Sequence, residues 1–195
     1  MDRLAAKAQL IRLLQRAYSG ELAAAHAYRG HWRAVKDPTE RRDIQKIEQD
    51  ELHHREQLGK MIAELGAAPD CFLERKMSAI GKTIGVLCHI SGWYIPMYGA
   101  GRLEKSNVRE YEHAARFAHL AGEERLIEDL LTWAETEWDH EKYFREKARS
   151  HWLRYLIPIW TPPATREAIR SSFDDYRRIN AITESGDREP APNAV

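Results

Sequence analysis

Cysteine is nearly absent from this chain, and neither charge sign is in excess. Two cysteines, Cys71 and Cys88, cannot build a disulfide framework or a four-thiolate metal site. Thirty Lys and Arg residues balance thirty Asp and Glu residues, which argues against a basic surface for nucleic acid. No apolar signal core precedes the first amphipathic pattern. We therefore expect a protein of the reducing cytoplasm with no nucleic-acid partner.

Glycine and proline are also scarce, with 11 and 8 residues in a chain of 195. This scarcity, with 31% charged residues, favours long helices over sheet. Helices are expected over about 4–35, 38–65, 73–120 and 123–155, the third interrupted near Pro96. Asp37 followed by Pro38 is typical of a helix start, and Pro162 and Pro163 follow the fourth segment. The pattern predicts an all-α antiparallel four-helix bundle.

A fifth, shorter amphipathic helix is expected after the prolines. Ile169, Phe173, Tyr176 and Ile179 recur at helical spacing. We therefore divide the chain into a bundle over 1–160, an accessory helix over 161–185 and a polar tail over 186–195, which is expected to be disordered. A homodimer formed through the accessory helix is left open.

One stretch without a formal charge, 83–101, approaches the length of a membrane-spanning helix. Its glycines and Pro96 dilute its hydrophobicity and disfavour a span. Two interpretations remain. The favoured one is a core helix; the other is a surface that rests on a membrane, together with aromatic residues such as Trp93 and Trp152.

Each of the four long segments breaks its own apolar stripe with a carboxylate. Following steps of three and four residues, the stripes contain Glu21, Glu51, Glu104 and Glu137, and in two segments a histidine follows three residues later, at His54 and His140. A buried, unpaired carboxylate costs several kcal/mol. Because no Lys or Arg lies on these stripes, metal cations are the expected partners.

The spacing places these carboxylates at matching heights. Glu21 and Glu51 are equidistant from the turn near Asp37, and Glu104 and Glu137 are equidistant from the turn near Gly122. Ferritin-like bundles with two metal ions use this set, one Glu from each of two helices and Glu-x-x-His from the other two. Four carboxylates balance two divalent cations, and the oxygen-rich set suits iron or manganese. We therefore expect a ferritin-like bundle with two iron ions, manganese being the alternative.

A third Glu-x-x-His, Glu110 to His113, is an internal control. Neither residue lies on the apolar stripe of its segment, so both are interpreted as part of a solvated face. His53 is also off its stripe, and a role in the outer shell or entry of the site is its alternative.

Four motifs resemble the demethoxyubiquinone hydroxylase family of ubiquinone biosynthesis. They are the string Gly20-Glu21-x-x-Ala24-x-x-x-Tyr28-x-Gly30, then Glu51-Leu52-His53-His54, then Leu103-Glu104 with Tyr111 seven residues after the Glu, and finally Glu137-x-x-His140. The resemblance covers about residues 10–150. The first string and the Glu-to-Tyr spacing are its more specific parts.

The resemblance implies a di-iron monooxygenase that hydroxylates a membrane-soluble quinone ring, using O2 and an external electron donor. Glu21, Glu51, His54, Glu104, Glu137 and His140 would be the metal ligands, with Glu51 and Glu137 bridging. Tyr111 would lie near the site, in hydrogen bonding or electron relay. The uncharged stretch before Glu104 would meet the substrate tail and the membrane, so the protein would be peripheral on the inner face of a membrane.

The chain also departs from the family pattern, in its fifth helix and in Lys82 and His89, which interrupt the apolar stretch. These departures concern the substrate more than the metal site. Two other functions are therefore carried forward. One is iron or peroxide handling of the ferroxidase, peroxidase or manganese catalase type, and the other is a non-catalytic helical scaffold.

Overall fold

A computed structural model describes residues 2–186 of the chain. Its elements are α1 (Arg3–Ala34), α2 (Pro38–Glu64), α3 (Cys71–Leu87), α4 (Tyr94–Ala121), η1 (Glu124–Leu126), α5 (Ile127–Ser150), η2 (Trp152–Tyr155) and α6 (Arg166–Gly186). The two η elements are single 3-10 turns. No strand occurs within the described range, so the all-α prediction is confirmed.

The helix ends follow the local sequence signals. The Asp37 side chain accepts hydrogen bonds from the backbone N–H groups of Thr39 and Glu40, and Pro38 is the first residue of α2. Gly122 ends α4 with a φ of 70°, in the left-handed region that glycine enters without penalty. Two tight antiparallel hairpins, α1–α2 and α4–α5, result from these ends.

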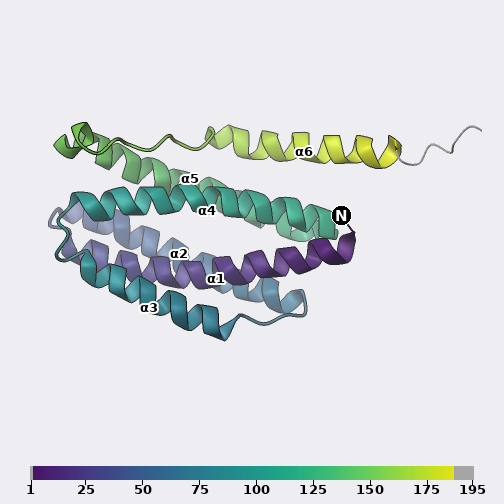
Figure 1. Cartoon of the computed structure of the whole chain (residues 1–195), viewed down its shortest axis with the longest axis horizontal. Helices are drawn as coiled ribbons and strands as arrows, with labels where there is room; N and C mark the ends of the chain where they lie inside the picture. The colour runs from purple at the N-terminus through teal and green to yellow at the C-terminus, as the bar shows by residue number, and fades with distance from the viewer. Residues whose placement is uncertain (1, 187–195) are drawn as a thin grey trace, which may run out of the picture.

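The two hairpins pack side by side to form a four-helix core, with α1 against α4 (Figure 1). The largest apolar cluster fills the half of the bundle away from the α3–α4 connection. Among its fully covered side chains are Leu10, Leu14, Leu58, Ile62 and Leu130. A smaller cluster around Tyr28, Met97 and Phe144 fills the other half. The polar residues described below lie between these two clusters.

The third predicted segment is two separate helices rather than one interrupted helix. The break lies at 88–93 rather than at Pro96. Pro96 lies within the first turn of α4, where proline is tolerated. The helix before the break, α3, lies along the outer side of α1 (Figure 1). A Cβ added at Gly81 would be 2.3 Å from the Ala23 carbonyl oxygen, so glycine permits this close approach.

The core-helix interpretation of 83–101 is wrong for its first half. Within α3 only Gly81 and Gly85 are buried, while Val86 is 67% exposed and Ile90, just after the helix, is 79% exposed. Sequence periodicity left both interpretations open, because it cannot tell which side of a short helix is covered. Within the described range, no helix is long and apolar enough to cross a bilayer.

The C-terminal helix α6 lies on the outer side of α4 and α5 (Figure 1). Ile169 and Phe173 are buried there, and Arg170 donates hydrogen bonds to Glu135 and Glu128. The predicted accessory helix is therefore present, and its start at Arg166 is close to that expected. The boundary at residue 160 stays a prediction, and the tail predicted over 186–195 lies outside the described residues, apart from Gly186.

Candidate metal centre

All six predicted ligands meet in the middle of the bundle. Each long helix of the two hairpins contributes a glutamate, and the second helix of each hairpin, α2 or α5, adds a histidine one turn later. None of the six is more than 6% exposed, and the set is Glu21, Glu51, His54, Glu104, Glu137 and His140. The stripe and height arguments therefore predicted the right residues as neighbours.

The cluster divides into two overlapping groups of four. One contains Glu21, Glu51, His54 and Glu137, and the other contains Glu51, Glu104, Glu137 and His140. Within each group, one potential ligand atom per residue lies within 4.8 Å of all the others. Glu51 and Glu137 belong to both groups, so two ions bound here would share these carboxylates.

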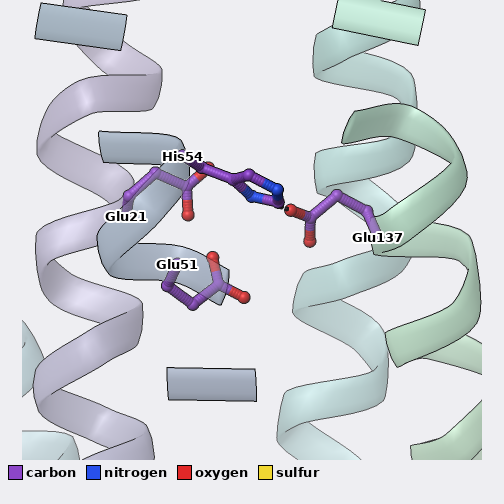
Figure 2. A group of neighbouring side chains, drawn as sticks. All are labelled: Glu21, Glu51, His54 and Glu137. Atoms are coloured by element: carbon purple, nitrogen blue, oxygen red, sulfur yellow. Dashed lines mark ion pairs between the residues drawn. The ribbon is translucent and has the colours of Figure 1, made fainter. Parts of the chain in front are cut away.

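The two histidines face the carboxylates with the same ring nitrogen. His54 Nδ1 lies 3.0 Å from Glu137 Oε1, and Figure 2 shows the two side chains pointing toward each other from opposite hairpins. His140 Nδ1 lies 3.5 Å from Glu51 Oε1 and 3.7 Å from Glu137 Oε2. Each histidine is thus placed near carboxylates of the other hairpin.

Several of these atoms have no hydrogen-bond partner within the part of the chain that the structure describes. They are Glu21 Oε2, both Glu51 oxygens, His54 Nδ1, Glu137 Oε1 and His140 Nδ1. Buried polar atoms left without partners are costly and uncommon. Cations at the two groups would satisfy them together, and the oxygen and imidazole donors suit iron or manganese. The residues present therefore fit a dinuclear site.

The protein without metal must distribute charge unevenly over this cluster. Burial, and then repulsion from Glu51, raises the pKa of Glu21 well above its usual value. Burial and repulsion from Glu137 do the same to the pKa of Glu104. Burial opposes ionisation of Glu137, but the His140 and His54 imidazoles beside it hold its pKa well below the usual value. Four adjacent carboxylates thus do not all carry charge unless cations join them.

A second set of side chains holds these residues in place. The Tyr28 hydroxyl donates to Glu104, and the Tyr111 hydroxyl donates to Glu21. His140 Nε2 lies 3.2 Å from Asp50 Oδ2, and such outward hydrogen bonds orient metal-binding histidines. The location of Tyr111 agrees with its predicted neighbourhood; its catalytic role stays a prediction.

Sequence reasoning missed two of these supporting residues. Asp50 precedes Glu51 but contacts a histidine of the other hairpin, and Asn107 donates to Glu104 at 2.9 Å. Asn107 lies one turn after Glu104 on the same helix, so its spacing was an available signal. The sequence gives no such signal for Asp50, because its hydrogen-bond partner depends on how α2 packs against α5.

The control residues lie outside the cluster. Glu110 forms an ion pair with Arg16 at 2.7 Å, and His113 is exposed. His53 is exposed as well. The Glu-x-x-His spacing alone therefore does not identify the site, whereas the position on the apolar stripe does.

Two adjoining cavities lie between α1, α3 and α4, and the inner of them reaches the cluster. The inner one, about 160 Å³, is lined by residues that include Glu21, Tyr111 and Asn107. The outer one, about 450 Å³, shares Ala27, Ile84 and Leu103 with it. The outer walls are mostly aliphatic. An apolar molecule could therefore approach the cluster along this side of the bundle.

The fold and the cluster together define an all-α bundle with a buried carboxylate–histidine centre. Among known families, the ubiquinone biosynthesis protein COQ7 family matches residues 8–114. The chain belongs to this family, and the resemblance found in the motifs is confirmed. The match contains Glu21, Glu51, His54 and Glu104, whereas Glu137 and His140 lie beyond it on α5. Neither the curated proteins nor the solved structures contain a match to the chain.

Proposed function

We propose that this protein is a di-iron hydroxylase that uses O2 and an external electron donor to oxidise a quinone-like or other hydrophobic aromatic substrate. The observation that carries the proposal is the cluster of buried, unsatisfied Glu and His atoms beside an apolar cavity. Family membership supports the same chemistry, because the family acts in ubiquinone biosynthesis.

In this proposal the six clustered residues hold two iron ions. Glu21 and His54 would serve one ion, Glu104 and His140 the other, and Glu51 and Glu137 both. Bound iron would supply the electron transfer to oxygen that side chains cannot perform. The chain itself contributes fixed spacing, burial that excludes water, and hydrogen bonds from Tyr28 and Tyr111 that orient Glu104 and Glu21.

The apolar cavities favour a hydrophobic substrate over iron or peroxide handling. A ferroxidase or peroxidase needs access only for small polar species. Here the path to Glu21 and Tyr111 passes Ala27, Ile84 and Leu103, which suit an aromatic ring with an aliphatic tail.

We also propose that the end of the bundle next to α3 meets a membrane surface. The α3–α4 connection and the end of α5 lie at the same end of the bundle (Figure 1), and these segments carry exposed apolar side chains. They include Ile90, Trp152, Tyr155 and Leu156, and the contact between the Trp93 and His151 rings shows that these two segments adjoin. Aromatic and aliphatic side chains of this kind suit a headgroup interface.

Metal content per chain tests the metal assignment. Wild-type protein loaded anaerobically with ferrous iron should hold about two ions per chain. His140→Ala should fail to retain a stable pair, whereas Glu110→Ala, which changes the control motif, should load like the wild type. Equal metal content in the two variants would overturn the ligand assignment.

Oxygen uptake tests the reaction class. Iron-loaded protein with a reductant should consume oxygen faster when an alkyl-substituted quinone or phenol is added, and a hydroxylated product should form. Uptake that responds only to ferrous iron or peroxide would replace the hydroxylase by an iron- or peroxide-handling protein. Retention of manganese in preference to iron would favour peroxide chemistry, and no metal at all would favour a scaffold.

A further inference from the structure

The outer cavity has few polar atoms. Its walls come from α1, the end of α3 and the start of α4, and most lining side chains are aliphatic. Tyr28, His31, Cys88 and Ser91 are the polar exceptions, and the Tyr28 hydroxyl is already committed to Glu104. A volume of about 450 Å³ suits a substituted aromatic ring.

His31 is the unexplained residue of this wall. It lies on α1 one turn after Tyr28, is only 2% exposed, and its Nε2 has no hydrogen-bond partner within residues 2–186. A buried polar atom without a partner costs about 1–3 kcal/mol. This nitrogen is covered by neighbouring atoms, so a ligand in the cavity would supply the missing hydrogen bond only after the imidazole turns toward it.

Stacking sets the plane of the imidazole. Its ring stacks on Phe144 with centroids 5.9 Å apart, and Phe144 stacks on Tyr28 at 5.6 Å. This stack joins the cavity wall to the residue that hydrogen-bonds Glu104. A ligand bonded to His31 would therefore occupy a defined position relative to the metal cluster.

We propose that His31 orients the aromatic substrate by hydrogen bonding to one oxygen of its ring, a proposal that rests on the proposed function. At Nε2, one neutral tautomer of the imidazole donates to a quinone carbonyl, and the other tautomer accepts from a phenol hydroxyl. Burial lowers the pKa of His31 to about 4, which keeps the ring neutral near pH 7. His31 thus acts as a positioning and specificity-determining residue, distinct from the metal ligands.

A pair of matched ligands tests this role on iron-loaded protein without oxygen. One ligand is a short-chain alkylbenzoquinone, and the other is the alkylbenzene of the same shape without ring oxygens. Their dissociation constants are measured by calorimetry for wild type, His31→Phe and His31→Gln. We expect His31→Phe to weaken quinone binding about tenfold and alkylbenzene binding less than twofold, whereas His31→Gln retains most of the quinone affinity because its amide still hydrogen-bonds.

His26→Phe is the matched control. The wild-type His26 lies on the same helix as His31, hydrogen-bonds Ser78 and lines neither cavity. Its substitution should therefore leave the affinities for the quinone and for the alkylbenzene unchanged. Circular dichroism and the melting temperature establish that each variant is folded. During turnover, His31→Phe should also consume more oxygen per product formed than wild type, because a misplaced ring is hydroxylated less often.

The outcomes separate the two proposals. If the wild type binds neither ligand, the cavity does not take an aromatic substrate and the proposed function loses its support. If the wild type binds the quinone and His31→Phe binds it equally well, the role of His31 is overturned while the proposed function stands. An equal loss of both ligands in a folded His31→Phe would show that the residue only shapes the cavity.

Discussion

Among the buried side chains with unpaired atoms, the carboxylate–histidine cluster and His31 have different explanations. Glu51 and Glu137 lie among other ligand-type residues, so cations would satisfy them as a group. His31 stands apart from that cluster, and burial is the sole cause of its lowered pKa. Its titration is therefore that of one isolated group.

The stability of the metal-free protein should depend on pH through His31. The pKa of this residue is about 4 when folded and about 6.5 when unfolded. The unfolded chain therefore binds more protons below pH 6.5, so stability is lost as the pH falls toward 4. Urea unfolding at pH 7 and pH 5 should show wild type losing about 2 kcal/mol relative to His31→Phe. Subtracting the variant removes the contributions of other titrating groups.

A difference between wild type and His31→Phe that does not change with pH would contradict the buried, neutral state of this histidine. A difference of the opposite sign would mean that the imidazole is charged when folded and has an acidic partner. An NMR titration of the ring protons gives the folded pKa directly and separates these cases.

The residues that cluster inside the bundle could be predicted from sequence, but not their hydrogen-bond partners. Helical spacing places Glu21 and Glu104 on apolar stripes because a helix repeats every 3.6 residues. The contact of Asp50 with His140 joins α2 to α5, and it depends on how the hairpins are rotated against each other. Similarly, the orphaned His31 nitrogen becomes evident only when α3 and α4 enclose its cavity.

At the scale of elements, α3 was the least predictable part of the fold. Its composition resembles that of a core helix, yet Gly81 and Gly85 are its only buried residues, and apolar side chains such as Val86 are exposed. The glycines are informative in retrospect. Gly81 and Gly85 lie one turn apart and allow the α1 backbone to approach closely, which sequence periodicity alone cannot distinguish from a weak helix.

Substitution of Gly81 tests how tightly α3 is held. A Cβ in Gly81→Ala would lie 2.3 Å from the Ala23 carbonyl oxygen and 2.6 Å from its Cα, so a backbone must shift. We expect a loss of about 1–3 kcal/mol in unfolding free energy and faster amide hydrogen exchange throughout α3. The apolar cavity beside α3 should also bind the alkylbenzoquinone more weakly.

Gly99→Ala is the control for this substitution. No atom lies within 4 Å of a Cβ added at Gly99, and the residue is inside α4. Alanine there should stabilise the protein by about 0.5–1 kcal/mol, because glycine loses more backbone entropy in a helix. Equal stability of Gly81→Ala and Gly99→Ala would show that α3 moves freely on α1.

At the scale of the whole molecule, the candidate metal centre connects the two hairpins. The shared residues Glu51 and Glu137 come from α2 and α5. Local turns form each hairpin without metal. The contact between the two hairpins, by contrast, brings their carboxylates close together, and these repel each other. Metal binding should therefore stabilise the association of the hairpins more than the helices themselves.

Metal loading should raise the melting temperature of the folded chain. A ligand present at a hundredfold its dissociation constant stabilises a protein by about 2.7 kcal/mol, which corresponds to roughly 5–10 °C for a chain of this size. Calorimetry with anaerobic ferrous iron, against a sample treated with chelator, measures this shift.

The shift should be larger at pH 7 than at pH 5, because protons compete with metal for the histidines. His140→Ala should show little shift at either pH, whereas Glu110→Ala should behave as wild type. If all three proteins gain equal stability, the metal binds elsewhere on the chain and the hairpins are joined by packing alone.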